Sequence, residues 1–290
     1  MPQRLVVCNQ RYLEIYGLSP DVVKPGCTLQ EILEFRKSRG SFAKDPGAYV
    51  AESGAQVRRG KRFVHTATLP DGRIIAVAAN PTSDGGWVAT HEDITERHRA
   101  EALIAHMARH DGLTGLLNRV EFEQKMSEAL NRLSRHGESF ALLMFDLDKF
   151  KPVNDTLGHP AGDALLRTVA DRLRSCTRDL DAVARLGGDE FAILQTHVEE
   201  PEQAARVLAN RLLDAIDQPI VLGGQPVRVG LSIGIALAPK DGSDIDELLK
   251  RADIALYRTK AAGRNGFRFF DAEADTPAAN EWEELSRRAS

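Results

Sequence analysis

Two aspartates in "LLMFDLDKF", residues 142–150, have the spacing of a metal site. The apolar run from Leu142 to Phe145 predicts a buried strand, and Asp146 and Asp148 leave its carboxyl end on one face, because alternate residues of a strand point the same way. Two carboxylates placed so closely repel each other unless a cation lies between them. A hard divalent ion with carboxylate and main-chain oxygen ligands is the usual solution.

A second acidic pair, Asp189 and Glu190, follows Gly187 and Gly188 in "ARLGGDEFAI". The alternating apolar residues on both sides predict a hairpin with these four residues at its turn. One interpretation is a turn that only faces water; the other is a carboxylate held rigidly between two core strands, as a metal site requires. In a split βαβ sheet this hairpin neighbours the first strand, so its acids can approach Asp146, and the combination favours the metal site.

Basic residues accompany both parts of this pattern. Lys149 and Lys151 follow the first acids directly, while Lys260 and Arg264 are expected on one face of a helix that ends at Gly263. For the second pair alone, a helix end that complements the helix dipole is a sufficient explanation. Together with a divalent-ion site, the basic residues fit a nucleoside triphosphate, whose phosphates need metal bridging and cationic neutralisation. The sequence contains no GxxxxGK[ST] loop, which excludes a P-loop enzyme.

Asn154 and Asp163 flank the turn "TLGHPAG". An aspartate accepts hydrogen bonds from the N1–H and N2–H₂ groups of guanine, and an asparagine can complement the remaining acceptors, so the pair favours guanine over adenine. The alternative interpretation is structural: Asn154 forms a turn and Asp163 caps the following helix.

The composition is that of a soluble globular protein. The 290 residues are 42% hydrophobic and 28% charged, and this length predicts two domains. No apolar run approaches the ~18 residues of a membrane span, and the N-terminus is a poor secretory signal, so we expect a cytoplasmic protein. Three scattered cysteines indicate neither a disulfide framework nor a zinc site. A net charge of −4 without a basic block argues against binding to polymeric nucleic acid.

Residues 1–94 predict a small α+β domain in which three β-rich runs form an antiparallel meander. The elements expected before the meander are a short strand and two helices, over residues 4–8, 11–17 and 28–38. Residues 95–111 predict a connecting helix with Asp93 or Thr95 as its N-cap. Its apolar stripe fits packing against a second copy or against its own domain equally well, and consists of Ala100, Leu103, Ile104 and Met107.

Residues 112–272 predict an α+β domain with a split βαβ sheet and an antiparallel core. Helices are expected around residues 118–135, 162–176, 201–216 and 245–262. Strands are expected at 140–148, in the hairpin within 181–196, at 227–238 and at 267–270, with a loop after the first of them. Residues 273–290 are expected to form a frayed or helical tail.

Four segments in this order resemble the GGDEF family of diguanylate cyclases, over about residues 108–272. They are "HDGLTGLLNR", "DLDKFKPVNDTLGHPAGDALL", "RLGGDEF" and "ADIALYRTKAAGRNGF". The resemblance implies a palm-like cyclase fold that condenses two GTP molecules into cyclic di-GMP and two pyrophosphates, with Mg²⁺ or Mn²⁺. It also implies a homodimer, because each domain binds one GTP and two domains meet face to face.

The resemblance implies a role for each residue at a matching position. The metal ligands would be Asp146, the main-chain carbonyl of Leu147, Asp189 and Glu190. The catalytic residues would be Asp189, Glu190 and Lys151, with one of the two acids taking the proton from the attacking 3′-hydroxyl and Lys151 stabilising the transition state. The substrate would contact Asn154, His159, Asp163, Gly187, Gly188, Lys260 and Arg264. Every one of these positions carries an accepted residue type, so we see no sign of a degenerate copy.

Arg178 and Asp181, in "RDLD" shortly before the hairpin, match the inhibitory RxxD site of the family. A surface ion pair is the alternative for such a spacing. The resemblance implies feedback inhibition by cyclic di-GMP, with the Arg178 guanidinium on a phosphate or guanine of the product.

The segment from Asn9 to Thr95 is similar to a PAS sensor domain, which implies a regulatory input through the connecting helix but no particular ligand. We expect His65 and His91 to be strand residues rather than haem ligands, and no flavin-linking cysteine motif is present. The sequence therefore predicts a PAS-regulated diguanylate cyclase of bacterial second-messenger signalling. The alternative is a module that binds GTP or cyclic di-GMP without turnover. No EAL phosphodiesterase motif follows, so hydrolysis is not expected.

Overall fold

The computed structural model describes residues 3–59, 61–83 and 85–275. The chain divides into two compact units, Met1–Ile104 and Ala105–Ser290. The tail expected at 273–290 lies outside the described residues from 276 onward. No helix within the described ranges is long and apolar enough to cross a bilayer.

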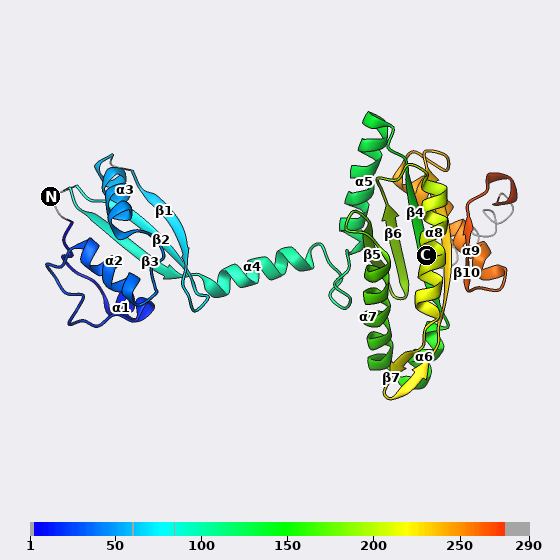
Figure 1. Cartoon of the computed structure of the whole chain (residues 1–290), viewed down its shortest axis with the longest axis horizontal. Helices are drawn as coiled ribbons and strands as arrows, with labels where there is room; N and C mark the ends of the chain where they lie inside the picture. The colour runs from blue at the N-terminus through cyan, green and yellow to red at the C-terminus, as the bar shows by residue number, and fades with distance from the viewer. Residues whose placement is uncertain (1–2, 60, 84, 276–290) are drawn as a thin grey trace. The chain divides into compact units, whose positions relative to one another are not determined.

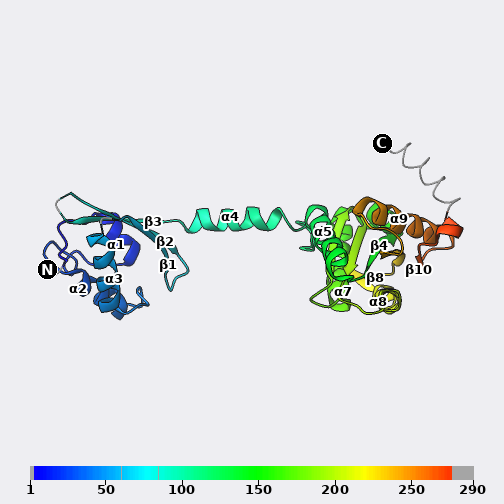
Figure 2. The same ribbon diagram turned by 90° about the horizontal axis from the view of Figure 1, so that it is seen from above.

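The N-terminal unit is a three-stranded antiparallel sheet with helices on one face (Figures 1 and 2). Its elements are α1 (Gln10–Tyr16), α2 (Leu29–Ser38), α3 (Pro46–Arg58), β1 (Phe63–Thr68), β2 (Ile74–Pro81) and β3 (Trp87–Asp93). The core packs Leu13 and Ile15 of α1 and Ile32 of α2 against Ile75 and Val77 of β2. The predicted meander is thus present, and β2 buries alternate residues because only one of its faces meets the helices.

Two details of this unit differ from the sequence prediction. The short strand expected at residues 4–8 does not form: Arg4 makes only an isolated bridge to Thr28, and Val6 and Val7 are 82% and 77% exposed. This segment runs beside the loop that precedes α2 rather than beside the sheet. Helix α3 was not predicted, because its sequence "PGAYVAESGAQVR" is rich in small residues and carries only a weak apolar stripe.

Helix α4 (Thr95–Met107) follows β3 directly. The Asp93 carboxylate accepts a hydrogen bond from the backbone N–H of Thr95, which fixes the start of the helix. Its apolar residues Leu103, Ile104 and Met107 are 58%, 67% and 60% exposed. These three side chains therefore do not pack on their own domain, which was one of the two interpretations of the stripe.

The C-terminal unit is a five-stranded sheet between two helical layers (Figure 2). The strand order is β10 (Gly266–Phe269), β9 (Gly230–Ala238), β4 (Phe140–Asp148), β6 (Glu190–Gln195) and β5 (Ala182–Gly187). The central strand β4 pairs antiparallel with both β6 and β9, while β10 pairs parallel with β9. The antiparallel core predicted from the sequence is confirmed.

Both faces of β4 are buried, each under its own helices. Leu143 and Phe145 face α7 (His159–Cys176) and α8 (Pro201–Asp217), whereas Leu142 faces α5 (Arg119–His136) and α9 (Ile245–Ala261). Because both faces are buried, the middle of β4 is apolar and its acids lie only at its end. A carboxylate inside the sheet would have no water to solvate it.

Two further differences concern the C-terminal unit. The loop expected after β4 contains the helix α6 (Phe150–Leu157), with Pro152 in its first turn, where the missing N–H of a proline costs no hydrogen bond. The strand expected at 227–238 begins only at Gly230. The preceding residues instead form a separate hairpin of β7 (Ile220–Leu222) and β8 (Gln225–Val227).

Candidate active site

The two acidic segments meet at one end of the C-terminal sheet. Asp146, near the end of β4, is the register partner of Glu190 at the start of β6. The backbone N–H of Leu147 donates to the carbonyl of Asp189, with an N–O distance of 3.4 Å. Gly187 and Gly188 both have positive φ, at 152° and 51°, which shapes the tight turn before Asp189.

Negative charge accumulates at this end of the sheet. Burial raises the pKa of Asp146, and the nearby Asp189 and Asp148 raise it further, against the opposing effect of Lys260. The Lys260 Nζ lies 2.8 Å from Asp146 Oδ2. The pKa of Glu190 is also raised, by burial first and then by Asp253 and Asp146. These acids remain ionised more easily when an additional cation is present, which is the electrostatic condition for a metal site.

The donors fit a hard divalent ion. The carboxylates of Asp146, Asp189 and Glu190 and the carbonyl of Leu147 offer only oxygen, which suits Mg²⁺ or Mn²⁺. Within the described residues, no three acidic, histidine or cysteine side chains gather closely enough to hold a metal by themselves. Mg²⁺ commonly takes only one or two carboxylates and completes its shell with substrate phosphates and water. The arrangement suits an ion that arrives with its substrate.

Asp148 differs from Asp146 in that its carboxylate is buried and hydrogen-bonded within the domain. It is 5% exposed, accepts a hydrogen bond from Ser232 Oγ at 2.8 Å and another from the backbone N–H of Asn265 at 3.0 Å. The Arg264 Nε lies 3.9 Å from Asp148 Oδ1. The prediction that Arg264 shares a helix face with Lys260 is wrong, because α9 ends at Ala261 and Arg264 has a φ of +65° in the following turn. The two cations nevertheless reach neighbouring acids of β4.

Arg185 links the turn to the start of the domain and was missed in the sequence. Its Nε and one terminal nitrogen donate to the carbonyl of Gly188 at 2.9 and 2.8 Å, and the other terminal nitrogen contacts both oxygens of Asp111 at 3.0 and 3.2 Å. The side chain is 12% exposed. Burial alone would raise the pKa of Asp111, but hydrogen bonds from Thr114 and Arg185 outweigh it and lower that pKa. A charged residue in an otherwise apolar strand was the signal that could have revealed it.

The two residues expected at guanine lie together between α6 and α7. The Asn154 Oδ1 atom is buried without a hydrogen-bond partner. The side chain packs against Gly162, where an added Cβ would lie only 1.9 Å from that oxygen. Asp163 follows Gly162 directly and is partly buried. An unpaired buried acceptor is suited to an N–H donor of a base edge.

The other predicted residues of this region are at the surface. Lys151, in the first turn of α6, and His159, at the start of α7, are both exposed. Across the described residues, neither side chain forms a hydrogen bond or an ion pair with the acids of β4 and β6, so the fold leaves both available to a ligand.

Comparison with known proteins decides the family. The sequence model described as "Diguanylate cyclase, GGDEF domain" matches residues 108–266, and the one described as "PAS fold" matches residues 2–102. The chain belongs to the GGDEF family. The resemblance predicted from the sequence is confirmed for both parts of the chain.

Relatives of this GGDEF protein include known cyclases. The diguanylate cyclase TpbB of Pseudomonas aeruginosa is 44% identical over 177 residues, which are 61% of this chain and 40% of TpbB. The bifunctional diguanylate cyclase/cyclic di-GMP phosphodiesterase MucR of the same species is 44% identical over 184 residues, 63% of this chain and 27% of MucR. The chain therefore spans less than half of the length of these curated relatives.

Solved structures agree with the fold of the GGDEF domain. The solved GGDEF domain of TpbB aligns with a TM-score of 0.54 at 42% identity, covering 56% of this chain and 95% of that one. The coiled coil and GGDEF domain of DgcB from Caulobacter crescentus, solved in complex with c-di-GMP, aligns with a TM-score of 0.53 at 30% identity. It covers 60% of this chain and 92% of that chain.

The RxxD pair of the GGDEF domain lies at the opposite end of the β5–β6 hairpin from the acidic turn. Arg178 donates to both oxygens of Asp181, at 3.5 and 3.2 Å, and to the carbonyl of Thr196 at 3.4 Å. The Asp181 side chain is fully buried, whereas that of Arg178 is 48% exposed. The pair borders an open pocket of about 600 Å³ that also includes Arg174 and Lys125.

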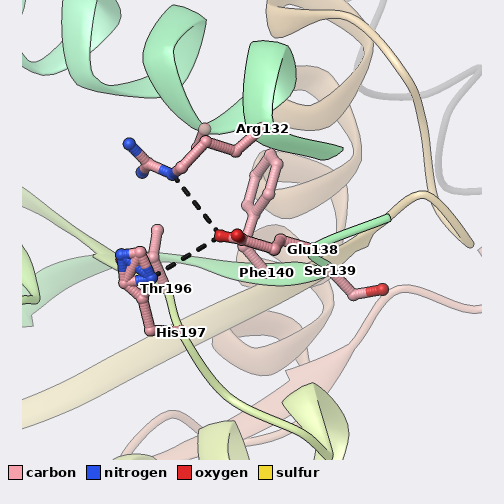
Figure 3. Close-up of a pocket in the computed structure, with 7 residues that line it drawn as sticks. Arg132, Glu138, Ser139, Phe140, Thr196 and His197 are labelled. Carbon is pink, nitrogen blue, oxygen red and sulfur yellow. Dashed lines mark ion pairs between the residues drawn. The ribbon is translucent and has the colours of Figure 1, made fainter. Parts of the chain in front are cut away.

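A smaller pocket adjoins this region behind Thr196 (Figure 3). In it, Glu138 lies between Arg132 of α5 and His197, which follows β6. The Glu138 Oε2 is 3.7 Å from the Arg132 Nε and 3.6 Å from the His197 Nδ1. The two pockets share Arg132, Thr196 and His197.

Proposed function

We propose that this protein is a cytoplasmic diguanylate cyclase that condenses two GTP molecules into cyclic di-GMP and two pyrophosphates. The observation that carries the proposal is the meeting of Asp146, Asp189 and Glu190 at one sheet end with Lys260 against them. Such a site holds the metal-bound phosphates of a nucleotide. The unpaired Asn154 oxygen supports guanine as its base.

In the proposed reaction the chain's residues bind, orient and exchange protons. Asp163 and Asn154 hold the guanine edge, while Lys260 and Arg264 neutralise the phosphates. Asp146, Asp189, Glu190 and the Leu147 carbonyl would hold a divalent ion, which would supply charge neutralisation at the phosphates. The 3′-hydroxyl of one GTP attacks the α-phosphorus of the other, the bond to pyrophosphate breaks, and a carboxylate of the turn takes the hydroxyl proton. The second half-reaction repeats these steps.

Either Asp189 or Glu190 is the proton acceptor in this proposal. The raised pKa of Glu190 brings its basicity closer to neutral pH, which favours proton transfer from a hydroxyl. Asp189 occupies the turn itself, whereas Glu190 is the first residue of β6. Lys151, exposed on α6, is proposed to contact the charge that develops as pyrophosphate leaves.

Two copies of the chain are needed for this chemistry, because one domain presents one GTP. The exposed stripe of α4, with Leu103, Ile104 and Met107, supports a homodimer in which two such helices pair. In the proposal, the PAS-fold domain regulates the cyclase through this helix. The half-exposed Arg178 beside a large pocket supports feedback inhibition by the product, and the relative DgcB was solved in complex with c-di-GMP.

Incubation of the full chain with GTP and Mg²⁺, followed by mass spectrometry of the nucleotides, tests the proposal. We expect cyclic di-GMP, with a specific activity that rises with protein concentration as dimers form. Omission of the divalent ion should remove the product. A protein that binds GTP at high concentration yet forms no cyclic di-GMP would instead be the binding module considered from the sequence.

A further inference from the structure

A second cluster of polar side chains lies in the N-terminal unit, on the face of the sheet that the helices cover. His65 of β1 and His91 of β3 are both register partners of Val77 in β2, so they flank it on the same face. The helices contribute Tyr12, Tyr16, Arg36 and Tyr49. The cluster thus draws on α1, α2 and α3 and on both outer strands of the sheet.

Rings and hydroxyl groups connect the members of the cluster. The Tyr16 hydroxyl is 2.8 Å from His91 Nδ1, and the Tyr12 ring meets the His91 ring edge-on at 4.9 Å. The Tyr49 hydroxyl is 3.4 Å from His65 Nε2. Neutral aromatic and imidazole groups therefore form the walls around the remaining member, Arg36.

Arg36 is the unusual residue of the cluster. It is 5% exposed, and its guanidinium lies 3.4 Å from the centre of the Tyr16 ring and 5.5 Å from that of Phe42. One terminal nitrogen donates to the carbonyl of Ser41 at 3.2 Å, but the Nε–H has no hydrogen-bond partner. Within the part of the chain that the structure describes, the ion pairs do not include Arg36, whose guanidinium interacts instead with the Tyr12 and Tyr16 side chains. Contact with aromatic rings offsets only part of the cost of burying such a charge.

The neighbours of Arg36 do not supply the missing negative charge. Burial lowers the pKa of His91 to about 4, with Arg36 as a further cause, so this imidazole is neutral at physiological pH. Burial likewise raises the pKa of Tyr49 to about 12, so its phenol stays protonated. Each is a hydrogen-bonding group without charge, and Arg36 is the only buried charged residue of the cluster. The exposed Lys44, whose Nζ lies 5.9 Å from the centre of the Tyr49 ring, and the exposed Glu52 are the charged groups at its edge.

We propose that the N-terminal domain binds a small organic monocarboxylate on Arg36. The carboxylate would accept the unused Nε–H and hydroxyl or imidazole hydrogens of the cluster, while its apolar part would lie against the Tyr16 and Phe42 rings. The one buried guanidinium balances one negative charge, whereas Lys44 is exposed to water, so a phosphate with two charges would be less well compensated inside the cluster. Phe42, Tyr49 and His65 are partly exposed and give the ligand a way in from solvent. The proposal does not rest on cyclase activity.

Calorimetric titration of the full chain with benzoate, and with its neutral counterpart benzamide, tests this proposal. We expect saturable binding of benzoate and none of benzamide. Arg36→Gln should weaken benzoate binding by about 10- to 100-fold, the usual effect of removing a charged hydrogen-bond donor. The matched control is Arg39→Gln, because Arg39 is exposed at the end of the same helix and should leave binding unchanged.

Hydrogen exchange of the unmodified chain gives a readout that does not depend on how the variants fold. Benzoate should slow exchange in α1, α2 and β3, and not in the C-terminal unit. Absence of benzoate binding, equal binding of benzamide, tighter binding of inorganic phosphate, or undiminished binding by a folded Arg36→Gln protein would each overturn the proposal.

Discussion

Replacement of Arg185 by methionine should lower both the stability of the GGDEF domain and its affinity for a divalent ion. The substitution removes two hydrogen bonds to the Gly188 carbonyl and two to Asp111. Charged hydrogen bonds contribute roughly 1.5–3 kcal/mol each when buried, but exposed fractions of 12% and 23% screen this ion pair. We therefore expect the free energy of unfolding of this domain to fall by about 2–3 kcal/mol.

The loss of Arg185 should also free the turn that carries Asp189. Residues that orient metal ligands typically change metal affinity by about 10- to 100-fold. The Mg²⁺ concentration for half-maximal cyclase activity should rise by this factor, which a titration of activity against Mg²⁺ measures. Arg172→Met is the matched control, because Arg172 donates to the Ala215 and Gln218 carbonyls far from the acids. Equal Mg²⁺ dependence in both variants would refute a positioning role for Arg185.

The ion pair between Arg185 and Asp111 should make the stability of the domain depend on pH, and three further substitutions test other parts of the site. Because the pKa of Asp111 is lowered in the folded state, the stability difference between wild type and Arg185→Met should be present at neutral pH and shrink as the pH falls below ~4 in chemical denaturation. Asp146→Asn should abolish cyclic di-GMP formation without lowering the melting temperature at pH 7, because a raised pKa means that the folded state disfavours the charged carboxylate. Gly162→Ala should displace Asn154 and raise the KM for GTP about tenfold or more, whereas Gly112→Ala, with open space around its Cβ position, should not. Arg178→Ala should raise the product concentration for half-inhibition at least ~10-fold in a cyclase assay; unchanged sensitivity would count against an inhibitory site.

The sequence predicted the elements that obey simple periodicity. Strand β4 was predicted at its observed bounds because its apolar run is continuous and ends at two acids. The β5–β6 hairpin and the long helices of the C-terminal unit were predicted from the regular spacing of their apolar residues. Helix α6 was missed, since a loop was expected after β4; it is only eight residues long, and Pro152 is compatible with its first turn.

The site was less predictable where it depends on contacts between distant residues. The sequence places Asp146 and Asp148 on the same face of one strand and does not distinguish their roles. Only the structure shows that Ser232 and Asn265 donate hydrogen bonds to Asp148. The link from Arg185 to Asp111 spans 74 positions and has no local pattern. The buried Arg36 was missed because a basic residue near a helix end is ordinarily exposed.

The β5–β6 hairpin carries the acidic turn at one end and the Arg178–Asp181 pair at the other, separated by six-residue strands. Substitutions at the acidic turn therefore leave the Arg178–Asp181 pair at the base of the hairpin in place, and substitutions at that pair leave the turn in place. Descent with modification can erase the acids while the base retains its fold and its arginine. Under the proposed function, a gene duplicate of this domain would have a short evolutionary route from synthase to receptor, with the architecture of the sheet unchanged.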